Sequence, residues 1–239
     1  MEAKTNVVLV HGAWADGSSW GKVIPLLQDK GFNVTAVQLP LTSLTDDIAV
    51  TRSMLAAQKG PTVLVGHSYG GAVITGAAND APNVTALVYI AAFGLDEGES
   101  LESLSKQGPA TAGGAQIRPD DHGFLWINPD GFPAAFAADV DPVEARVMAA
   151  VQRPLSIQSF AEKSGPPAWK HLPSWFLVST NDQMIPPQAE EFMAKRMGAT
   201  VRSVPASHAS MVSRPNDVAE LITLASESAR VVSAKATHS

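Results

Sequence analysis

Short runs of apolar and β-branched residues alternate with longer stretches of helical spacing in the N-terminal part of the chain. The runs are almost continuously apolar, which is typical of strands covered on both faces of a parallel sheet. The predicted strands are Asn6–Val10, Asn33–Val37, Thr62–Val65 and Val84–Ile90. The predicted helices are Trp20–Lys30, Leu44–Gln58 and Gly70–Ala78. Alternation of this kind predicts a parallel sheet joined by right-handed crossovers.

The alternation stops after Ile90. Residues 94–172 contain frequent Gly and Pro, scattered aromatic residues and no clear strand, and the best helix there is Asp141–Gln152, with Pro142 at its first position. An unstructured loop of that length is uncommon in a compact domain. We therefore expect residues 94–172 to form a mostly helical cap inserted into the sheet domain.

The strand and helix pattern resumes after the insertion. It predicts strands at Ser174–Ser179 and Thr200–Val204, helices at Pro187–Met197 and Pro215–Glu227, and a partly frayed C-terminus. The expected fold is therefore an α/β core, residues 1–93 and 173–239, with a mostly parallel central sheet and helices on both faces.

Composition excludes several functional classes. The chain has 239 residues, 45% of them hydrophobic, and a net charge of -6 without a basic cluster, which argues against nucleic acid or an anionic membrane as a partner. It has no cysteine, so neither disulfides nor a thiolate metal site is possible. The N-terminus lacks signal-peptide features, and no stretch approaches 18 apolar residues. We expect a cytoplasmic protein.

One motif carries the candidate chemistry. Residues 66–70 read Gly-His-Ser-Tyr-Gly, and about one chain in ten of this length would contain G-x-S-x-G by chance. Here the motif follows a predicted strand and opens a predicted helix, as a nucleophile elbow requires. The glycines avoid collisions at a sharp turn, and the helix N-terminus favours developing negative charge at Ser68. Ser68 is the candidate nucleophile.

A serine hydroxyl needs a base, and the base needs a carboxylate to orient it. His208 is the best base because it lies in the loop after the last predicted strand, at the sheet edge where α/β proteins bind ligands. Asp182 directly follows a strand and is the best carboxylate, with Asp96 as the alternative. The other histidines are in the motif (His67), after the first strand (His11), in the insertion (His122, His171) and in the C-terminal tail (His238).

Two backbone N–H groups are candidates for stabilising an oxyanion. One is that of Tyr69, the residue after the nucleophile, and the other is that of Ala13 in the loop after the first strand. The assignment of Ala13 rests on its position alone, because backbone donors leave no side-chain signature.

These residues together resemble the α/β-hydrolase superfamily, whose chain order Ser…Asp…His matches Ser68, Asp182 and His208. More narrowly, the chain is similar to plant methyl esterases, hydroxynitrile lyases and their bacterial esterase relatives. The segments that carry the likeness are residues 7–40, 63–73 and 181–222. The resemblance implies a serine hydrolase core of the α/β-hydrolase fold, a cap over the site, and no cofactor or metal.

Two positions favour ester hydrolysis over lyase chemistry. The lyases that resemble this chain carry threonine at the position of Gly12 and lysine at the position of Ala209, directly after the catalytic histidine. Many relatives have leucine or methionine in place of Tyr69, whose side chain is expected to narrow the pocket or to hydrogen-bond with substrate.

The sequence therefore predicts a carboxylesterase that cleaves small carboxylic esters, without naming the substrate. Three alternatives stay open: lyase chemistry, cofactor-free oxygenase chemistry, and a non-catalytic ligand-binding homologue. Esters, lactones and thioesters are all possible substrates, and a homodimer is compatible with the composition. The candidates for the pocket are Gly12 and the aromatic residues Phe124, Trp126, Phe132 and Phe136.

Overall fold

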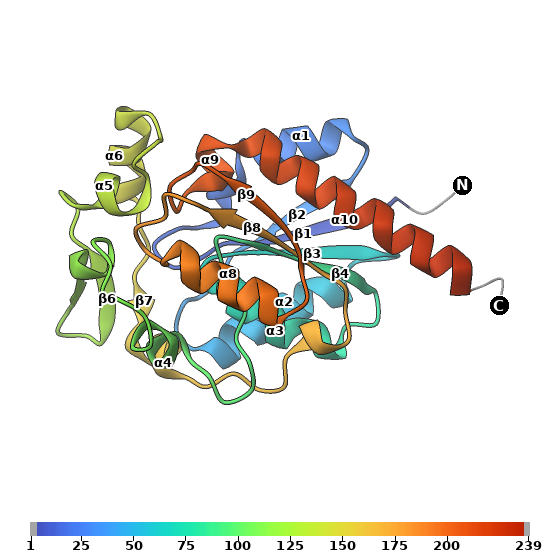
Figure 1. The fold of residues 1–239 in the computed structure, drawn as a ribbon, viewed down its shortest axis with the longest axis horizontal. Helices are drawn as coiled ribbons and strands as arrows, with labels where there is room; N and C mark the ends of the chain where they lie inside the picture. Colours follow the sequence, from blue (N-terminus) through green and yellow to red (C-terminus); the bar gives the residue numbers. More distant parts are fainter. Residues whose placement is uncertain (1–3, 237–239) are drawn as a thin grey trace.

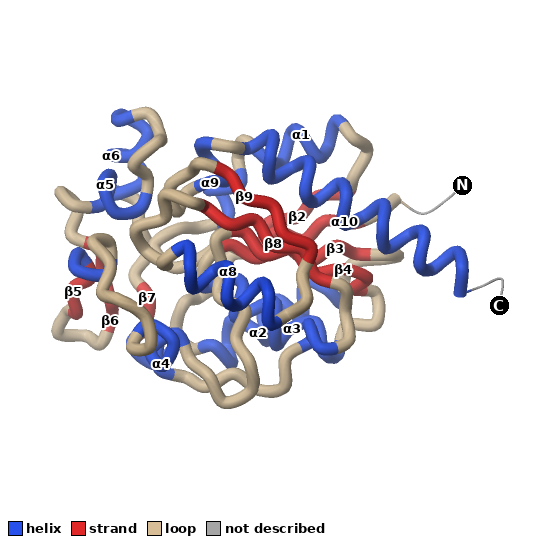
Figure 2. Tube along the Cα trace, in the orientation of Figure 1, coloured by secondary structure: helices blue, strands red, loops and turns tan. Residues whose placement is uncertain are grey.

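A six-stranded parallel sheet forms the centre of the computed structural model, which describes residues 4–236 (Figures 1 and 2). The strands lie in the order β2-β1-β3-β4-β8-β9, and every neighbouring pair is parallel. Their bounds are β1 Asn6–Val10, β2 Asn33–Val37, β3 Thr62–His67, β4 Val84–Ile90, β8 Ser174–Ser179 and β9 Thr200–Val204. The predicted α/β fold and its parallel sheet are confirmed.

Helices cover both faces of this sheet (Figure 1). Helices α1 and α10 pack together on one face, and α2, α3 and α8 lie on the other. Their bounds are α1 Val23–Asp29, α2 Leu44–Ala56, α3 Tyr69–Ala77, α8 Pro187–Arg196, α10 Pro215–Ala236 and, preceding α10, the short α9 Ser210–Ser213. The central strands are buried along their whole length, which explains their continuously apolar sequences.

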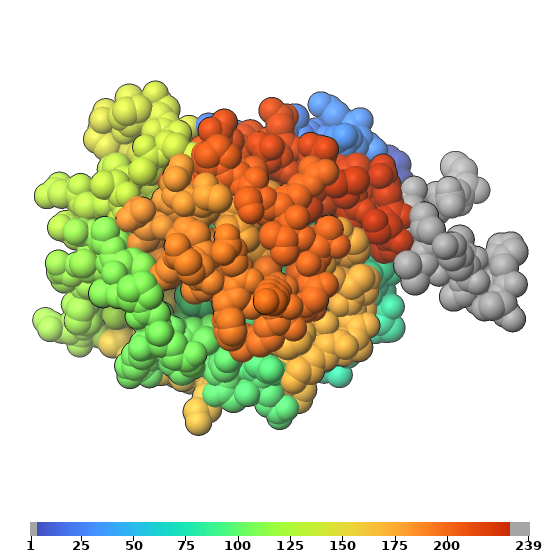
Figure 3. All heavy atoms as spheres, viewed as in Figure 1, coloured from blue at the N-terminus to red at the C-terminus, as the bar shows by residue number. Residues whose placement is uncertain are grey.

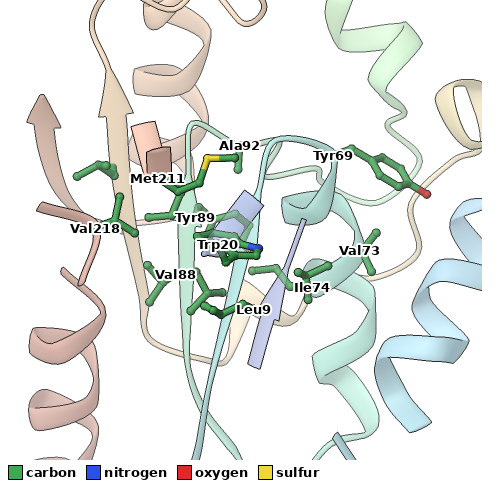
Figure 4. Close-up of a cluster of buried hydrophobic side chains, with 14 of the residues drawn as sticks. Leu9, Trp20, Tyr69, Val73, Ile74, Val88, Tyr89, Ala92, Met211 and Val218 are labelled. Carbon is green, nitrogen blue, oxygen red and sulfur yellow. The ribbon is translucent and has the colours of Figure 1, made fainter. Parts of the chain in front are cut away.

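The core joins the sheet to both helical layers. Figure 4 shows side chains from β1 and β4 packing with side chains from the flanking helices, among them Leu9, Val88, Ile74, Met211 and Val218. Burial of this apolar surface is the main stabilising contribution to such a fold. It holds the carboxyl ends of the strands, where the candidate site residues lie, in fixed positions.

The inserted segment, residues 94–172, lies between β4 and β8, and much of it occupies one end of the molecule (Figures 1 and 3). It contains helices α4 Leu101–Ser105, α5 Phe132–Phe136, α6 Pro142–Ala150 and α7 Ile157–Ala161, and strands β5 Ile117–Pro119, β6 Phe124–Ile127 and β7 Leu155–Ser156. The strands form an antiparallel sheet in the order β5-β6-β7. The expectation that this segment lacks strands was wrong, because strands of two to four residues are too short to establish a period of two.

The largest differences from the predicted helix bounds are at the start of α1 and at the end of α10. The chain from Gly17 to Trp20 is a 3-10 helix, so α1 begins only at Val23. Helix α10 continues to Ala236, well beyond the predicted end at Glu227. His238 lies outside the described residues. Within residues 4–236, none of the helices has the length and apolar character needed to cross a bilayer.

Candidate active site

Ser68 occupies a strained turn between β3 and α3. Its backbone angles, φ 53° and ψ −123°, are rare for a residue with a side chain. The two motif glycines permit this turn: a Cβ added to Gly66 would lie 2.5 Å from the carbonyl oxygen of Gly70, and one added to Gly70 would lie 2.5 Å from that of Val10. The sequence therefore dictates a sharp elbow that presents Ser68 at the start of a helix.

His208 and Asp182 form a buried pair. The Nδ1 atom of His208, in the loop after β9, lies 2.6 Å from Oδ2 of Asp182, in the loop after β8, and both side chains are fully buried. The other oxygen, Oδ1, accepts hydrogen bonds from the backbone N–H groups of Met184 (2.6 Å) and Ile185 (3.0 Å). The carboxylate is thus fixed in place, and it fixes the imidazole with Nδ1 protonated.

The other ring nitrogen of His208 is free of partners. Nε2 is buried and forms no hydrogen bond with any described residue. His208 and Ser68 line the same cavity, so Nε2 is available to a proton released there. Contacts between a nucleophile and its base are often long without substrate and shorten when substrate binds.

The neighbouring aromatic rings hold His208 from two sides. The ring of Phe136 meets that of His208 edge to face, with centroids 4.8 Å apart. The Nε2 atom of His67 lies 2.8 Å from the carbonyl oxygen of His208, and burial holds the pKa of His67 well below its usual value. A neutral His67 therefore donates this hydrogen bond and anchors the loop that carries His208.

The remaining histidines and the alternative carboxylate are either bonded elsewhere or exposed. Burial lowers the pKa of His11 to about 4, and its ring nitrogens bond with the carbonyl of Gly12 and the N–H of Leu39, so it is structural. His122 and His171 are exposed. Asp96, the alternative carboxylate, forms an ion pair with Lys170 at 2.6 Å instead of contacting a histidine.

The two candidate oxyanion donors border Ser68. Tyr69 is the first residue of α3, where backbone N–H groups have no acceptor inside the helix. Ala13 follows Gly12, which lies so close to Ser68 that an added Cβ would be 2.7 Å from the serine Cβ. Both Ala13 and Tyr69 line the cavity together with Ser68 and His208. This arrangement can offer two donors to one oxygen atom.

The side chain of Tyr69 is bound inside the protein. Its hydroxyl donates a hydrogen bond to Oδ2 of Asp47 at 2.5 Å, and Oδ1 of Asp47 accepts the backbone N–H of Leu41 at 2.9 Å. Burial raises the pKa of the Asp47 carboxyl to about 6. The expected hydrogen bond from this tyrosine to substrate is therefore replaced by one to Asp47, a partner for which the sequence offered no signal.

Asp47→Asn is expected to remove a pH-dependent loss of stability. A carboxyl whose pKa is raised from 3.8 to about 6 by folding stabilises the native state fully below the unfolded value, and that contribution is lost as pH rises through about 6. The difference corresponds to about 3 kcal/mol. The free energy of unfolding of the variant, relative to the parent, should therefore rise by about that amount between about pH 4 and pH 8 in urea titrations.

The neighbouring Asp46 provides the matched control for this experiment. Asp46 is exposed, and hydrogen bonds from Ser43 and Thr42 lower the pKa of its carboxyl. The free energy of unfolding of Asp46→Asn, relative to the parent, should therefore fall as pH rises, opposite to the change for Asp47→Asn. A difference between Asp47→Asn and the parent that is constant across the pH range would contradict the assignment of a buried, titrating Asp47.

A cavity of about 980 Å³ opens above Ser68 and His208. It lies between the sheet edge, the inserted segment and α8, and its surface is mainly apolar. Prominent side chains in its wall are Leu101, Leu104, Leu125, Phe160, Met184 and Phe192. Pockets of about 300–1,000 Å³ typically enclose drug-sized ligands, so this cavity is at the large end of that range.

The residues predicted to form the pocket lie outside the cavity lining. Phe132 and Phe136 are buried and stack on each other with centroids 4.9 Å apart, and Trp126 is exposed with its Nε1 bonded to Asp120. Phe124 and Trp126 flank Leu125 on β6, and Leu125 lines the cavity. Side chains alternate between the two faces of a strand, so the aromatic neighbours of Leu125 point away. Gly12 adjoins Ser68 and is not part of the lining either.

Several known proteins are similar to this chain over most of its length. The chain is 27% identical to the pyrethroid hydrolase of Sphingobium wenxiniae over 91% of this chain and 86% of that protein. It is 26% identical to methylesterase 1 of Arabidopsis thaliana over 80% of this chain and 83% of that protein. The crystal structure of a pyrethroid hydrolase from Sphingobium faniae superposes with a TM-score of 0.80 at 25% identity, covering 92% of this chain and 96% of that one.

The family assignment rests on a match over most of the chain. The sequence pattern of the alpha/beta hydrolase family fits residues 7–221, which include the elbow, the inserted segment and the His208 loop. Together with the parallel sheet and the chain order of Ser68, Asp182 and His208, this match identifies the family. The protein belongs to the alpha/beta hydrolase family.

Proposed function

We propose that the protein is a carboxylesterase that cleaves esters with bulky apolar groups through an acyl-enzyme on Ser68. The observation that carries the proposal is the oriented Asp182–His208 pair, whose free Nε2 shares a large apolar cavity with the strained Ser68. Esterases among the relatives, including a pyrethroid hydrolase and a methylesterase, support the same reaction class.

The mechanism follows from these positions. His208 accepts the proton of Ser68 as its Oγ attacks the ester carbonyl, and Asp182 stabilises the imidazolium that forms. The N–H groups of Ala13 and Tyr69 stabilise the oxyanion. His208 then protonates the departing alkoxide, and the alcohol leaves an acyl group on Ser68. Water, deprotonated by His208, hydrolyses this acyl-enzyme and restores the serine.

The size of the cavity changes the substrate class expected from the sequence, from small esters to bulky ones. Small esters would fill only a fraction of about 980 Å³ and would gain little from its apolar walls. Esters with aromatic or branched groups on the acyl or the alcohol side bury more surface there. We therefore propose bulky apolar esters in place of small ones.

Lyase chemistry fits the site less well. A threonine at position 12 would bring its Cβ to 2.7 Å from the Ser68 Cβ, so this site has no room for the hydroxyl that the resembling lyases place there. Residue 209 is a buried alanine, which offers no positive charge to a cyanide leaving group.

The test combines turnover with labelling. Initial rates are measured for p-nitrophenyl acetate, butyrate and octanoate and for a 3-phenoxybenzyl ester, and kcat/KM should increase with the size of the apolar group. A p-nitrophenyl phosphonate should inactivate the enzyme with one equivalent bound, on the peptide that contains Ser68. Absence of both turnover and labelling would contradict the proposal, and binding of the esters without turnover would indicate a non-catalytic homologue.

A further inference from the structure

Glu190 is a fully buried residue in the first turn of α8. It lies on the same helix face as Met193 and Ala194, which are also buried, because residues three and four apart share a face. Its Oε2 accepts the backbone N–H of Ser179, at the end of β8, at 3.0 Å. Its other oxygen, Oε1, is buried and receives no hydrogen bond from any described residue.

Glu190 and Asp182 meet at the same turn, because Oε2 of Glu190 accepts the N–H of Ser179 and the carbonyl oxygen of Ser179 accepts the backbone N–H of Asp182 at 3.1 Å. Asp182 already accepts three hydrogen bonds, from Met184, Ile185 and His208. A carboxylate has about four acceptor positions, so one position remains on Asp182. Two ionised carboxylates are both acceptors and cannot bond to each other. A hydrogen bond between them therefore requires that one of the two holds a proton.

The environment places that proton on Glu190. Burial raises the pKa of Glu190 well above its usual value, and the negative charges of Asp182 and, to a smaller extent, Glu191 raise it further. Asp182 already accepts three hydrogen bonds, whereas Glu190 accepts one and keeps Oε1 for a proton. Among the described residues, no lysine or arginine forms an ion pair with either carboxyl group.

We propose that Glu190 is protonated and donates a hydrogen bond through its carboxyl proton to Asp182, so that it acts as a positioning residue behind the Asp182–His208 pair. The proposal rests on the proposed function for its kinetic consequences, though not for the protonation itself. The neutral acid completes the acceptor capacity of Asp182 and fixes the carboxylate plane against β8 and α8. It also withdraws negative charge from Asp182, which makes the imidazolium form of His208 less favourable.

Glu190→Gln and Glu190→Leu test this role kinetically. Glutamine keeps a donor for Asp182 and an acceptor for Ser179, so its kcat should stay within about threefold of the parent, with the same acid limb in the pH profile of kcat/KM. Leucine removes the donor, so kcat should fall about tenfold or more at nearly constant KM. The acid limb should move to higher pH, because Asp182 then stabilises protonated His208 more strongly.

Two kinetic outcomes would overturn the proposal. If Glu190 were ionised, Glu190→Gln would remove a negative charge and move the acid limb to lower pH than in the parent. If Glu190 served packing alone, both variants would keep the parent's pH profile. Glu191→Gln, an exposed neighbour on the same helix, is the matched control and should change neither kcat nor the profile.

Infrared difference spectroscopy tests the proton without relying on turnover or on a folded Glu190→Leu variant. At about pH 8, where Asp47 is ionised, the parent should show the carbonyl band of a protonated carboxyl group, and the band should be missing in Glu190→Gln and present in Glu191→Gln. Absence of the band in the parent would overturn the proposal. If the band is found in a protein without esterase activity, the proposed function fails and the protonation stands.

Discussion

Ser68→Ala is expected to lower kcat for ester hydrolysis by about 10⁶-fold, because it removes the atom that forms the acyl-enzyme. The residual rate should come from the oxyanion donors and from substrate positioning alone. KM should change little, since the cavity walls that contact the substrate stay in place. Initial rates with p-nitrophenyl butyrate, compared at equal folded protein concentration, measure the effect.

The backbone makes alanine the right substitution at position 68. Alanine, like serine, has a Cβ, so the φ of 53° costs the same in both proteins and the elbow should keep its shape. Ser105→Ala is the control, because Ser105 lines the same cavity and has no assigned role in the chemistry. Its kcat should stay within about threefold of the parent. If Ser68→Ala retained more than about one per cent of the parent activity, the nucleophile would have to be another residue.

The sheet and the elbow could be predicted from the sequence because their signals are local. Every central strand is an apolar run bounded by turn residues, and Gly66, Ser68 and Gly70 are adjacent in the chain. Parallel strands bring their carboxyl ends to one edge of the sheet. The loops after β8 and β9, which carry Asp182 and His208, therefore begin at the same edge as Ser68.

The cavity walls could not be predicted in the same way, because they depend on which face of an element points inward. On β6 the large residues Phe124 and Trp126 were predicted to line the pocket, but the smaller Leu125 between them lines the cavity instead. The strands of the inserted segment are too short for a period to reveal this orientation. The aliphatic wall residues, such as Leu101, carry no sequence signal that separates them from core residues.

Buried polar partners are the other class that sequence reasoning missed. The bond between Tyr69 and Asp47 joins residues of two helices, and nothing in either helix indicates it. Glu190 does have a sequence signal, because it is an acidic residue on the buried face of α8 that also carries Met193 and Ala194. A charged residue on an apolar helix face is a signal worth following, because burial of a carboxyl requires a partner.

Asp182→Asn is expected to lower kcat by about 10⁴-fold while leaving KM nearly unchanged, since the side chain at 182 orients His208 and does not line the cavity. An asparagine oxygen can still accept the N–H groups of Met184 and Ile185. Its amide nitrogen then faces Nδ1 of His208, and two donors cannot bond. The imidazole therefore shifts its proton to Nε2, and this nitrogen can no longer accept the proton of Ser68.

Asp96→Asn is the control, because Asp96 is the other carboxylate that follows a strand of the sheet and it binds Lys170 at the surface. A surface ion pair contributes about 1 kcal/mol at most, so this variant should keep its kcat and nearly its full stability. The reverse outcome, with Asp96→Asn inactive and Asp182→Asn active, would mean that another carboxylate orients the base. The comparison is decisive because both changes remove one negative charge, and only the one at 182 alters the tautomer of His208.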